Sequence, residues 1–253
     1  MTRRARSRRT RISVRMRVTV SSLSLVGIVL VAALTPTLLS DSAPADATLP
    51  EASTVATDGT DGTALALLAT LPIKGRAAKT GYDRSGDFGS AWLDVDRNGC
   101  DTRNDILARD LTDIVTSETC RVQSGTLTGP YTGETIGFVR GTSTSSLVQI
   151  DHVVALSNAW QTGAQQLTQV QRESLANDPL NLLAVDGATN SSKGAGDTAT
   201  WLPPRKSYRC AYVARQVSVK ATYGLWVTPA EHAAMIRVLS DCPSEQAMTA
   251  AVE

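Results

Sequence analysis

The stretch VQIDHVVALSNAW, residues 148–160, is the part of this sequence on which the fold depends. Its β-prone start ends at Asp151 and His152, which strand alternation would place on opposite faces unless the strand ends there and the backbone bends. The apolar run NLLAV at 181–185 predicts a second short strand, and the polar turn NSSKGAGD at 190–197 could start a helix. The order predicts a β-hairpin followed by a helix.

Helices dominate the expected elements on either side of this hairpin. Apolar spacing and start signals such as Thr228-Pro229 predict them. The expected helices cover about 64–71, 102–114, 165–176, 205–222 and 228–239, and the expected strands cover 147–154, 181–185 and a β-prone stretch with turns at 121–136, with Val139 as a candidate continuation. The chain is therefore expected to be α+β, mostly helical and with few strands.

The first 47 residues have the features of a secretory signal. Residues 1–17 contain eight arginines and no acidic residue, and residues 23–39 are almost wholly apolar. Ala45-Asp46-Ala47 then fits the small-x-small pattern of a cleavage site. We expect cleavage and secretion, with no stable membrane association afterwards. The alternative is an uncleaved single-span anchor, because about 17 apolar residues are near the lower limit for crossing a bilayer.

The remaining chain suits one acidic domain. Loss of eight arginines and two aspartates leaves 17 basic and 22 acidic residues among 206, a net charge of −5. We expect a flexible tether over 48–63 and a single, monomeric domain over 64–253. No heptad or longer period is present, which excludes coiled-coil, collagen-like and repeat architectures.

The four cysteines favour disulfides. They contain no C-x-x-C, so a zinc ribbon is a poor interpretation, whereas an exported protein meets an oxidising environment. Three pairings are possible, and we favour the sequential one, Cys100 with Cys120 and Cys210 with Cys242.

Only two histidines are available for catalysis. His232 lies in the first turn of a predicted helix among Ala and Met residues, so an ordinary helix position is expected. His152 follows Asp151, but an isolated Asp-His pair more often contains a structural histidine. The absence of H-E-x-x-H and the small number of histidines disfavour a metallopeptidase.

The downstream segments change the interpretation of His152. DHVVAL (151–156), NLL (181–183) and NSSKG (190–194) together resemble the HNH endonuclease superfamily, the ββα-metal or His-Me finger nucleases. The wider stretch from about 82 to 242 resembles small secreted bacterial HNH proteins related to the C-terminal domain of GmrSD restriction enzymes. The resemblance implies a ββα-metal finger over about 147–200 and a metal-dependent endonuclease, with DNA as the expected substrate and RNA as the alternative.

The resemblance also implies roles for four residues. His152 would be the general base that activates water, and Asp151 and Asn190 would bind one divalent ion. Asn181 would support the hairpin and the histidine loop. Asn190 stands where some members of the superfamily have a final histidine. Oxygen ligands favour Mg²⁺ or Mn²⁺ over Zn²⁺.

Basic residues gather after the hairpin. Residues 190–220 carry a net charge of +5 and the rest of the secreted chain −10. We expect phosphate contacts from this segment, and the alternative is a solvated helix face. The expected contacts are Lys193, Arg205, Lys206 and Arg209.

A second candidate metal site precedes the first cysteine. DVDRNG at 94–99 matches the start of a D-x-D-x-N-G calcium loop, and Asp105 occupies the twelfth position, where a longer Glu is usual. The candidate ligands of a structural Ca²⁺ are Asp94, Asp96, Asn98 and Asp105. An ordinary Asx-rich turn is the alternative. A catalytically silent, secreted calcium-binding or interaction module is the alternative to a nuclease.

Overall fold

A computed structural model describes residues 62–248, apart from 118–119 and 143. The predicted signal segment and nearly all of the predicted tether lie outside the described residues. The described chain is α+β, with two small antiparallel sheets and both expected disulfides, Cys100–Cys120 and Cys210–Cys242. None of its helices has the length and apolar character that crossing a membrane requires.

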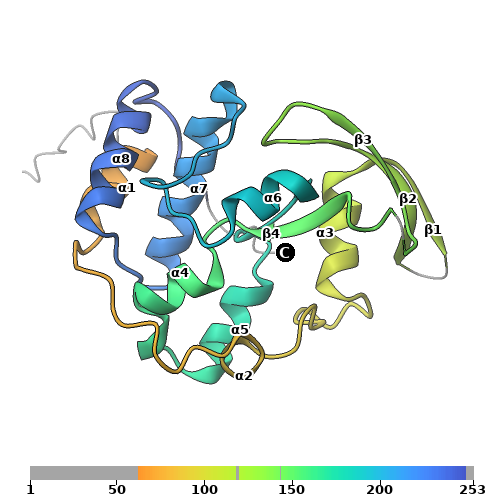
Figure 1. Ribbon diagram of the computed structural model, residues 1–253, viewed down its shortest axis with the longest axis horizontal. Coiled ribbons are helices and arrows are strands. Elements are labelled where there is room, and N and C mark those ends of the chain that lie inside the picture. Colours follow the sequence, from red (N-terminus) through yellow and green to blue (C-terminus); the bar gives the residue numbers. More distant parts are fainter. Residues whose placement is uncertain (1–61, 118–119, 143, 249–253) are drawn as a thin grey trace, which may run out of the picture. The chain divides into compact units, whose positions relative to one another are not determined.

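Three helices precede four short strands along the described chain, and the remaining helices follow with one further strand among them (Figure 1). The helices are α1 (Ala64–Thr70), α2 (Arg84–Phe88), α3 (Thr102–Asp110), α4 (Leu156–Gln161), α5 (Gln169–Asn177), α6 (Gly187–Lys193), α7 (Arg209–Thr222) and α8 (Pro229–Ser240), with single 3₁₀ turns at Ala164–Gln166 and Lys206–Tyr208. The strands are β1 (Thr112–Ser117), β2 (Arg121–Thr128), β3 (Thr135–Val139), β4 (Val148–His152) and β5 (Leu182–Asp186).

The expected hairpin and helix are present as β4, β5 and α6. The two strands pair antiparallel, from Val148 opposite Asp186 to His152 opposite Leu182. The Asp186 side chain caps α6 by accepting a hydrogen bond from the backbone N–H of Thr189. A Cβ atom at Gly187 would lie 2.1 Å from the Ser146 carbonyl oxygen, so only glycine allows the helix to start this close to the strand.

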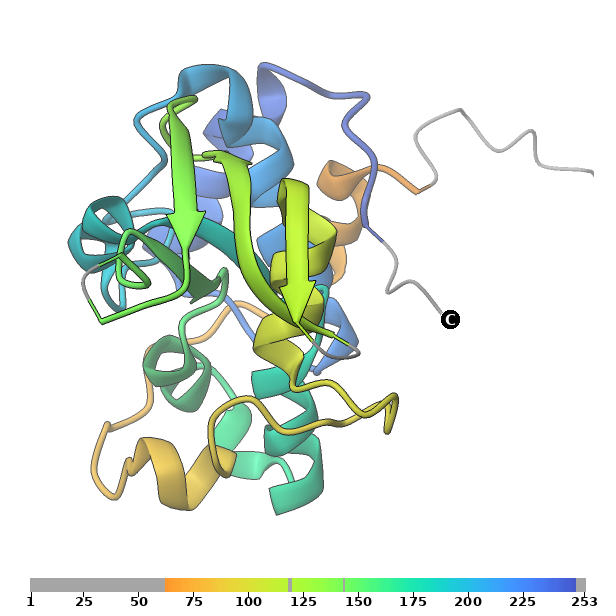
Figure 2. The same ribbon diagram turned by 90° about the vertical axis from the view of Figure 1, so that its right-hand side faces the viewer.

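The second sheet has the order β1-β2-β3, and Figure 2 shows it beside α3. One hydrophobic core joins the inner side of this sheet to α3 and to the β4–β5 hairpin. Its buried members include Ile106, Leu107, Leu127, Phe138, Val148 and Leu182. The hairpin therefore rests on a packed layer and is not an isolated two-stranded ribbon.

Two further cores hold the helices. In the first, α1, α7 and α8 pack around Tyr212, Val213, Val217 and Met235, and Cys210–Cys242 links the start of α7 to the segment after α8. In the second, α2, α4 and α5 pack around buried residues that include Phe88, Leu156 and Leu175. Since α2 and α5 also border the end of β4, this core positions the surroundings of His152.

Some element boundaries differ from those expected. The helix predicted over 102–114 ends at Asp110, and Ile114 lies in β1. Helices α2 and α4, of five and six residues, were not expected. Asn190 lies inside α6 and not at its start, because Asp186 is the cap. The helix expected at 228–239 is confirmed as α8, with a Thr228–Glu231 capping box.

Candidate active site

Asp151 and His152 open into one cleft although they are neighbours on a strand. The cleft has a volume of about 300 Å³, and Asn190 of α6 lines it as well. Strand β4 ends at His152 and the backbone bends over the next two residues, so simple alternation does not hold here. Three of the four residues singled out by the HNH resemblance therefore share this cleft.

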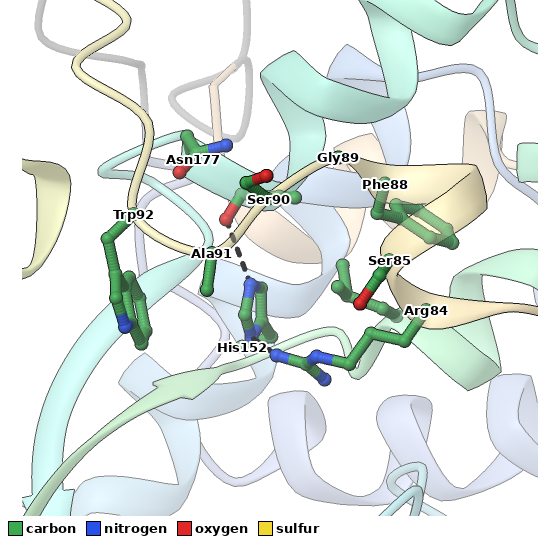
Figure 3. Close-up of a pocket in the computed structure, with 11 residues that line it drawn as sticks. Arg84, Ser85, Phe88, Gly89, Ser90, Ala91, Trp92, His152 and Asn177 are labelled. Atoms are coloured by element: carbon green, nitrogen blue, oxygen red, sulfur yellow. Dashed lines mark hydrogen bonds between the residues drawn. The ribbon is translucent and has the colours of Figure 1, made fainter.

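A backbone carbonyl fixes the state of the His152 ring. Nε2 lies 2.9 Å from the carbonyl oxygen of Ala176 in α5, which can only accept a hydrogen bond. The neutral ring therefore carries its proton on Nε2, and its Nδ1 lone pair is an acceptor. Arg84 donates a long hydrogen bond to Nδ1 through Nη2, which is 3.5 Å away (Figure 3). The indole of Trp92 stacks on the imidazole, with centroids 6.3 Å apart.

The surroundings keep His152 uncharged. Burial, reinforced by the positive charge of Arg84, lowers the pKa of His152 from 6.5 to about 3, against the opposing effect of the Ala176 hydrogen bond. The ring is neutral near pH 7 and can accept a proton at Nδ1.

Both carboxylate oxygens of Asp151 have partners. The Lys193 Nζ lies 2.9 Å from Oδ1, and the Tyr131 hydroxyl donates to Oδ2 at 2.6 Å. Burial raises the pKa of Asp151, and the charge of Lys193 opposes this shift. Lys193 also donates to the His152 carbonyl, and its side chain is 0% exposed. The ammonium group expected to touch phosphate is thus buried against Asp151, and its position does not fit a surface contact.

The oxygen donors in the cleft fit a hard divalent cation. A carboxylate has about four lone-pair sites, and Lys193 and Tyr131 use two of those on Asp151. Asn190 donates through Nδ2 to Gln149 Oε1 at 2.9 Å, which leaves its carbonyl oxygen for a ligand. Among the described residues no group of three or more His, Cys, Asp or Glu could hold a metal. A cation here would have two protein ligands and several positions for water and phosphate, as Mg²⁺ prefers.

Asn181 is fully buried and links two backbone segments next to the site through hydrogen bonds. Its Oδ1 accepts from the backbone N–H of Val154 at 2.8 Å, and its Nδ2 donates to the Leu175 carbonyl at 3.2 Å. It therefore connects the loop after His152 to the end of α5, next to Ala176. This position suits the supporting role that the resemblance implies.

The other basic candidates lie on the segment between α6 and α7. Arg205 and Lys206 are exposed, and Arg209 is half-buried, with Nε donating to the Pro203 carbonyl. None of the three lines the cleft. The backbone N–H of Arg205 donates to the Tyr131 carbonyl at 2.9 Å. Arg205 is thus next to the tyrosine whose hydroxyl donates to Asp151.

The predicted calcium loop forms an Asx-rich turn before α3. The Asn98 side-chain amide donates to Asp96 and Asp105, and the backbone N–H groups of Asn98 and Gly99 donate to Asp94. These bonds match the simpler of the two interpretations. Ca²⁺ binding stays a prediction.

Three residues at the site were not singled out from the sequence. Arg84 and Trp92 contact His152 from α2 and from the loop after it, and Tyr131 reaches Asp151 from the turn between β2 and β3. Trp92 has a left-handed φ of 61°, a conformation that costs about 1–3 kcal/mol for a residue with a side chain. The only sequence signal was the place of Arg84 and Trp92 within the stretch that carries the resemblance.

Comparisons with known proteins identify the family of this chain. A model of the family "GmrSD restriction endonucleases, C-terminal domain" matches residues 101–238. A protein of Arthroderma benhamiae, described as an uncharacterized secreted protein, is 38% identical over 182 residues, which are 71% of this chain and 85% of that protein. No solved structure matches the chain. The expected relation to GmrSD is confirmed, while a bacterial source stays a prediction. The chain belongs to the family of the C-terminal nuclease domain of GmrSD restriction endonucleases.

Proposed function

We propose that this protein is a secreted endonuclease that hydrolyses phosphodiester bonds of nucleic acid, with DNA as the first substrate to test. One observation carries the proposal. A neutral histidine, whose Nδ1 is an acceptor next to Arg84, lines a cleft of about 300 Å³ that Asp151 and Asn190 also line. A general base beside an anionic and a neutral oxygen donor is the set that metal-assisted hydrolysis of a phosphodiester requires.

His152 takes a proton from water in this proposal. The Ala176 carbonyl holds the opposite nitrogen, so it orients the ring and stabilises the positive charge that the imidazole gains. The approach of an anionic phosphate favours that charge as well. Positioned general bases contribute about 10²- to 10⁴-fold to a rate.

Asp151 and Asn190 would hold one divalent cation, Mg²⁺ or Mn²⁺. When bound, the cation supplies positive charge that stabilises the phosphate and the leaving oxygen. Lys193 and Tyr131 fix the orientation of the Asp151 carboxylate, and Asn181 holds the loop that follows His152.

Three observations support secretion. The first 47 residues have the composition of a signal segment, and the relative from Arthroderma benhamiae is described as secreted. Two disulfides in the described chain also suit an oxidising compartment.

The test is plasmid cleavage by protein collected from the medium of cells that express the whole chain. The wild type, His152→Ala and the control His232→Ala are compared in Mg²⁺, Mn²⁺, Ca²⁺ and EDTA, with circular dichroism to check folding. His232 is half-buried on α8 and lines no part of the cleft. We expect nicking in Mg²⁺ or Mn²⁺ by the wild type and His232→Ala, and a loss of at least about 100-fold in His152→Ala.

An inert wild type on both DNA and RNA in every metal would contradict the proposal. The calcium-binding module would then become the leading alternative, and calorimetric titration of the wild type with Ca²⁺ would test it. Protein that stays in the cells would contradict secretion alone.

A further inference from the structure

Arg84 reaches the proposed active site from outside the region that the family model matches. It is the first residue of α2, and the matched region begins at residue 101. Its Nη2 lies 3.5 Å from the His152 Nδ1 and donates to the lone pair of that nitrogen. Arg84 and His152 both line the large cleft and also a smaller hollow, which Figure 3 shows.

The guanidinium of Arg84 is exposed and has no acidic partner among the described residues. The ion pairs found there involve other arginines and lysines. The two nearest acids in sequence serve α2 itself, because Asp83 accepts from the backbone N–H of Ser85 and Asp87 accepts from that of Asp83. Arg84 therefore presents at the cleft a positive charge that forms no salt bridge in the described chain, with the Asp151 carboxylate as a nearby opposite charge.

Lys193, the other cation near His152, cannot take the place of Arg84. Its Nζ is buried and already donates to the Asp151 carboxylate and to the His152 carbonyl. A negatively charged ligand that enters the cleft thus meets Arg84 as the available cation beside the proposed base.

We propose that Arg84 is a catalytic residue whose guanidinium binds a non-bridging oxygen of the scissile phosphate. The inference rests on the proposed function. Arg84 Nη2 donates to Nδ1 in this structure, so a phosphate oxygen that takes over this donor would release the Nδ1 lone pair for a water about 2.6–3.2 Å away. The planar fork of arginine suits two phosphate oxygens at once.

The reaction step is balanced without change at Arg84. The water oxygen forms a bond to phosphorus while the bond to the leaving 3′ oxygen breaks. His152 Nδ1 takes the proton of the water, and the leaving oxygen takes a proton from solvent. Arg84 stays protonated and stabilises the negative charge that the phosphoryl oxygens gain.

Kinetics of Arg84→Ala and Arg84→Lys test the proposal, with Arg237→Ala as the matched control. Arg237 is an exposed arginine of α8 that lines neither hollow. We expect kcat of Arg84→Ala to fall by about 10²- to 10³-fold, since one preorganised donor is removed, and KM to rise by less than kcat falls. Lysine keeps the positive charge but lacks the two-pronged guanidinium, so kcat of Arg84→Lys should lie between those of the wild type and Arg84→Ala. The control Arg237→Ala should have the kcat of the wild type. If Arg84→Ala unfolds at a lower temperature than the wild type, Arg84→Met is used as the test variant in its place. Met keeps the apolar stem of the arginine and lacks its charge.

A binding measurement separates this inference from the proposed function. A fluorescein-labelled DNA duplex is titrated in EDTA at several salt concentrations and followed by anisotropy. Removal of one phosphate contact should reduce the slope of log K against log salt by about 0.9 in Arg84→Ala and leave it unchanged in Arg237→Ala.

Cleavage by Arg84→Ala within about threefold of the wild type, or an unchanged salt slope, would overturn the inference. If the wild type does not cleave at all, the proposed function and the catalytic role fail together. A slope reduced only in Arg84→Ala would still identify the phosphate contact.

Discussion

Buried charge connects the two halves of the proposed site. Lys193 of α6 neutralises Asp151 of β4, and the same ammonium holds the carbonyl of His152. The two side chains are 0% and 5% exposed, so removal of one leaves the other largely buried without its charged partner. The pair thus fixes the helix against the strand that carries the proposed base, and its effect on stability should exceed that of a surface pair.

We expect Lys193→Met to lower the free energy of unfolding by about 3–5 kcal/mol, because it leaves the Asp151 carboxylate buried with only Tyr131 as a partner. Urea unfolding of the full chain measures the loss. Lys206→Met, at an exposed position, is the control and should change stability by less than about 0.5 kcal/mol. Equal stability of the two variants would show that the buried pair does not stabilise the fold.

The order of the motifs was sufficient to predict that these residues meet, although α4 and α5 lie between the two strands of the hairpin. Asp151, His152 and Asn190 line one cleft because β4 pairs with β5 and α6 follows β5 directly. Arg84 and Tyr131 could not be found this way. Their contacts cross 68 and 20 residues and depend on how α2 and the β2–β3 turn pack against β4.

The hairpin and its helix need a close approach between backbones. The first residue of α6, Gly187, leaves no room for a side chain beside Ser146. Helix propensity alone would favour alanine by about 1 kcal/mol, but an atom placed 2.1 Å from a carbonyl oxygen forces the helix away from the strand. The glycine therefore sets the distance between Asn190 and Asp151.

Gly187→Ala should therefore destabilise the protein and weaken cleavage, with a stability loss of about 1–3 kcal/mol from the forced backbone shift. Gly137→Ala, in β3 with nothing within 4 Å of the added Cβ, is the matched control and should stay near the wild type. Thermal unfolding and plasmid nicking are the measurements. Wild-type behaviour of Gly187→Ala would mean that the helix can shift without consequence for the site.

The capping residues of α8 made this helix predictable from the sequence, whereas α4 has no such residues and was not predicted. Thr228, Pro229 and Glu231 mark the start of α8 in both sequence and structure. Helix α4 has six residues and no side-chain cap, so nothing local marks it. The predicted continuation of α3 was wrong because helical spacing at Ile114 also fits β1, where the β-branched run IVT favours a strand.

The disulfides join elements that surround the proposed site. Cys100–Cys120 links the loop before α3 to the start of β2, and Cys210–Cys242 links α7 to the segment after α8. The disulfides close loops of 20 and 32 residues. By lowering the entropy of the unfolded chain, each should raise the free energy of unfolding by about 3–4 kcal/mol. The four cysteines and the signal-like first segment predicted two disulfides, and the sequential pairing is confirmed.

Charge is distributed unevenly over the chain, and this should decide how it binds DNA. Residues 190–220 carry +5, whereas the rest of residues 48–253 carries −10, so this segment should attract a polyanion more strongly than the average surface. Arg205 and Lys206 are exposed on that segment and lie outside the cleft. They can therefore contribute to binding without taking part in the chemical step.

We expect Arg205→Ala/Lys206→Ala to weaken DNA binding in EDTA and to reduce the slope of log K against log salt by about 1.8, the value for two phosphate contacts. At saturating DNA, kcat should stay within about threefold of the wild type, since these two side chains bind the substrate and the transition state equally well. The control Arg121→Ala/Arg237→Ala removes the same charge from exposed positions on β2 and α8. An equal loss of affinity in both double variants would show that net charge, and not the segment between α6 and α7, determines DNA binding.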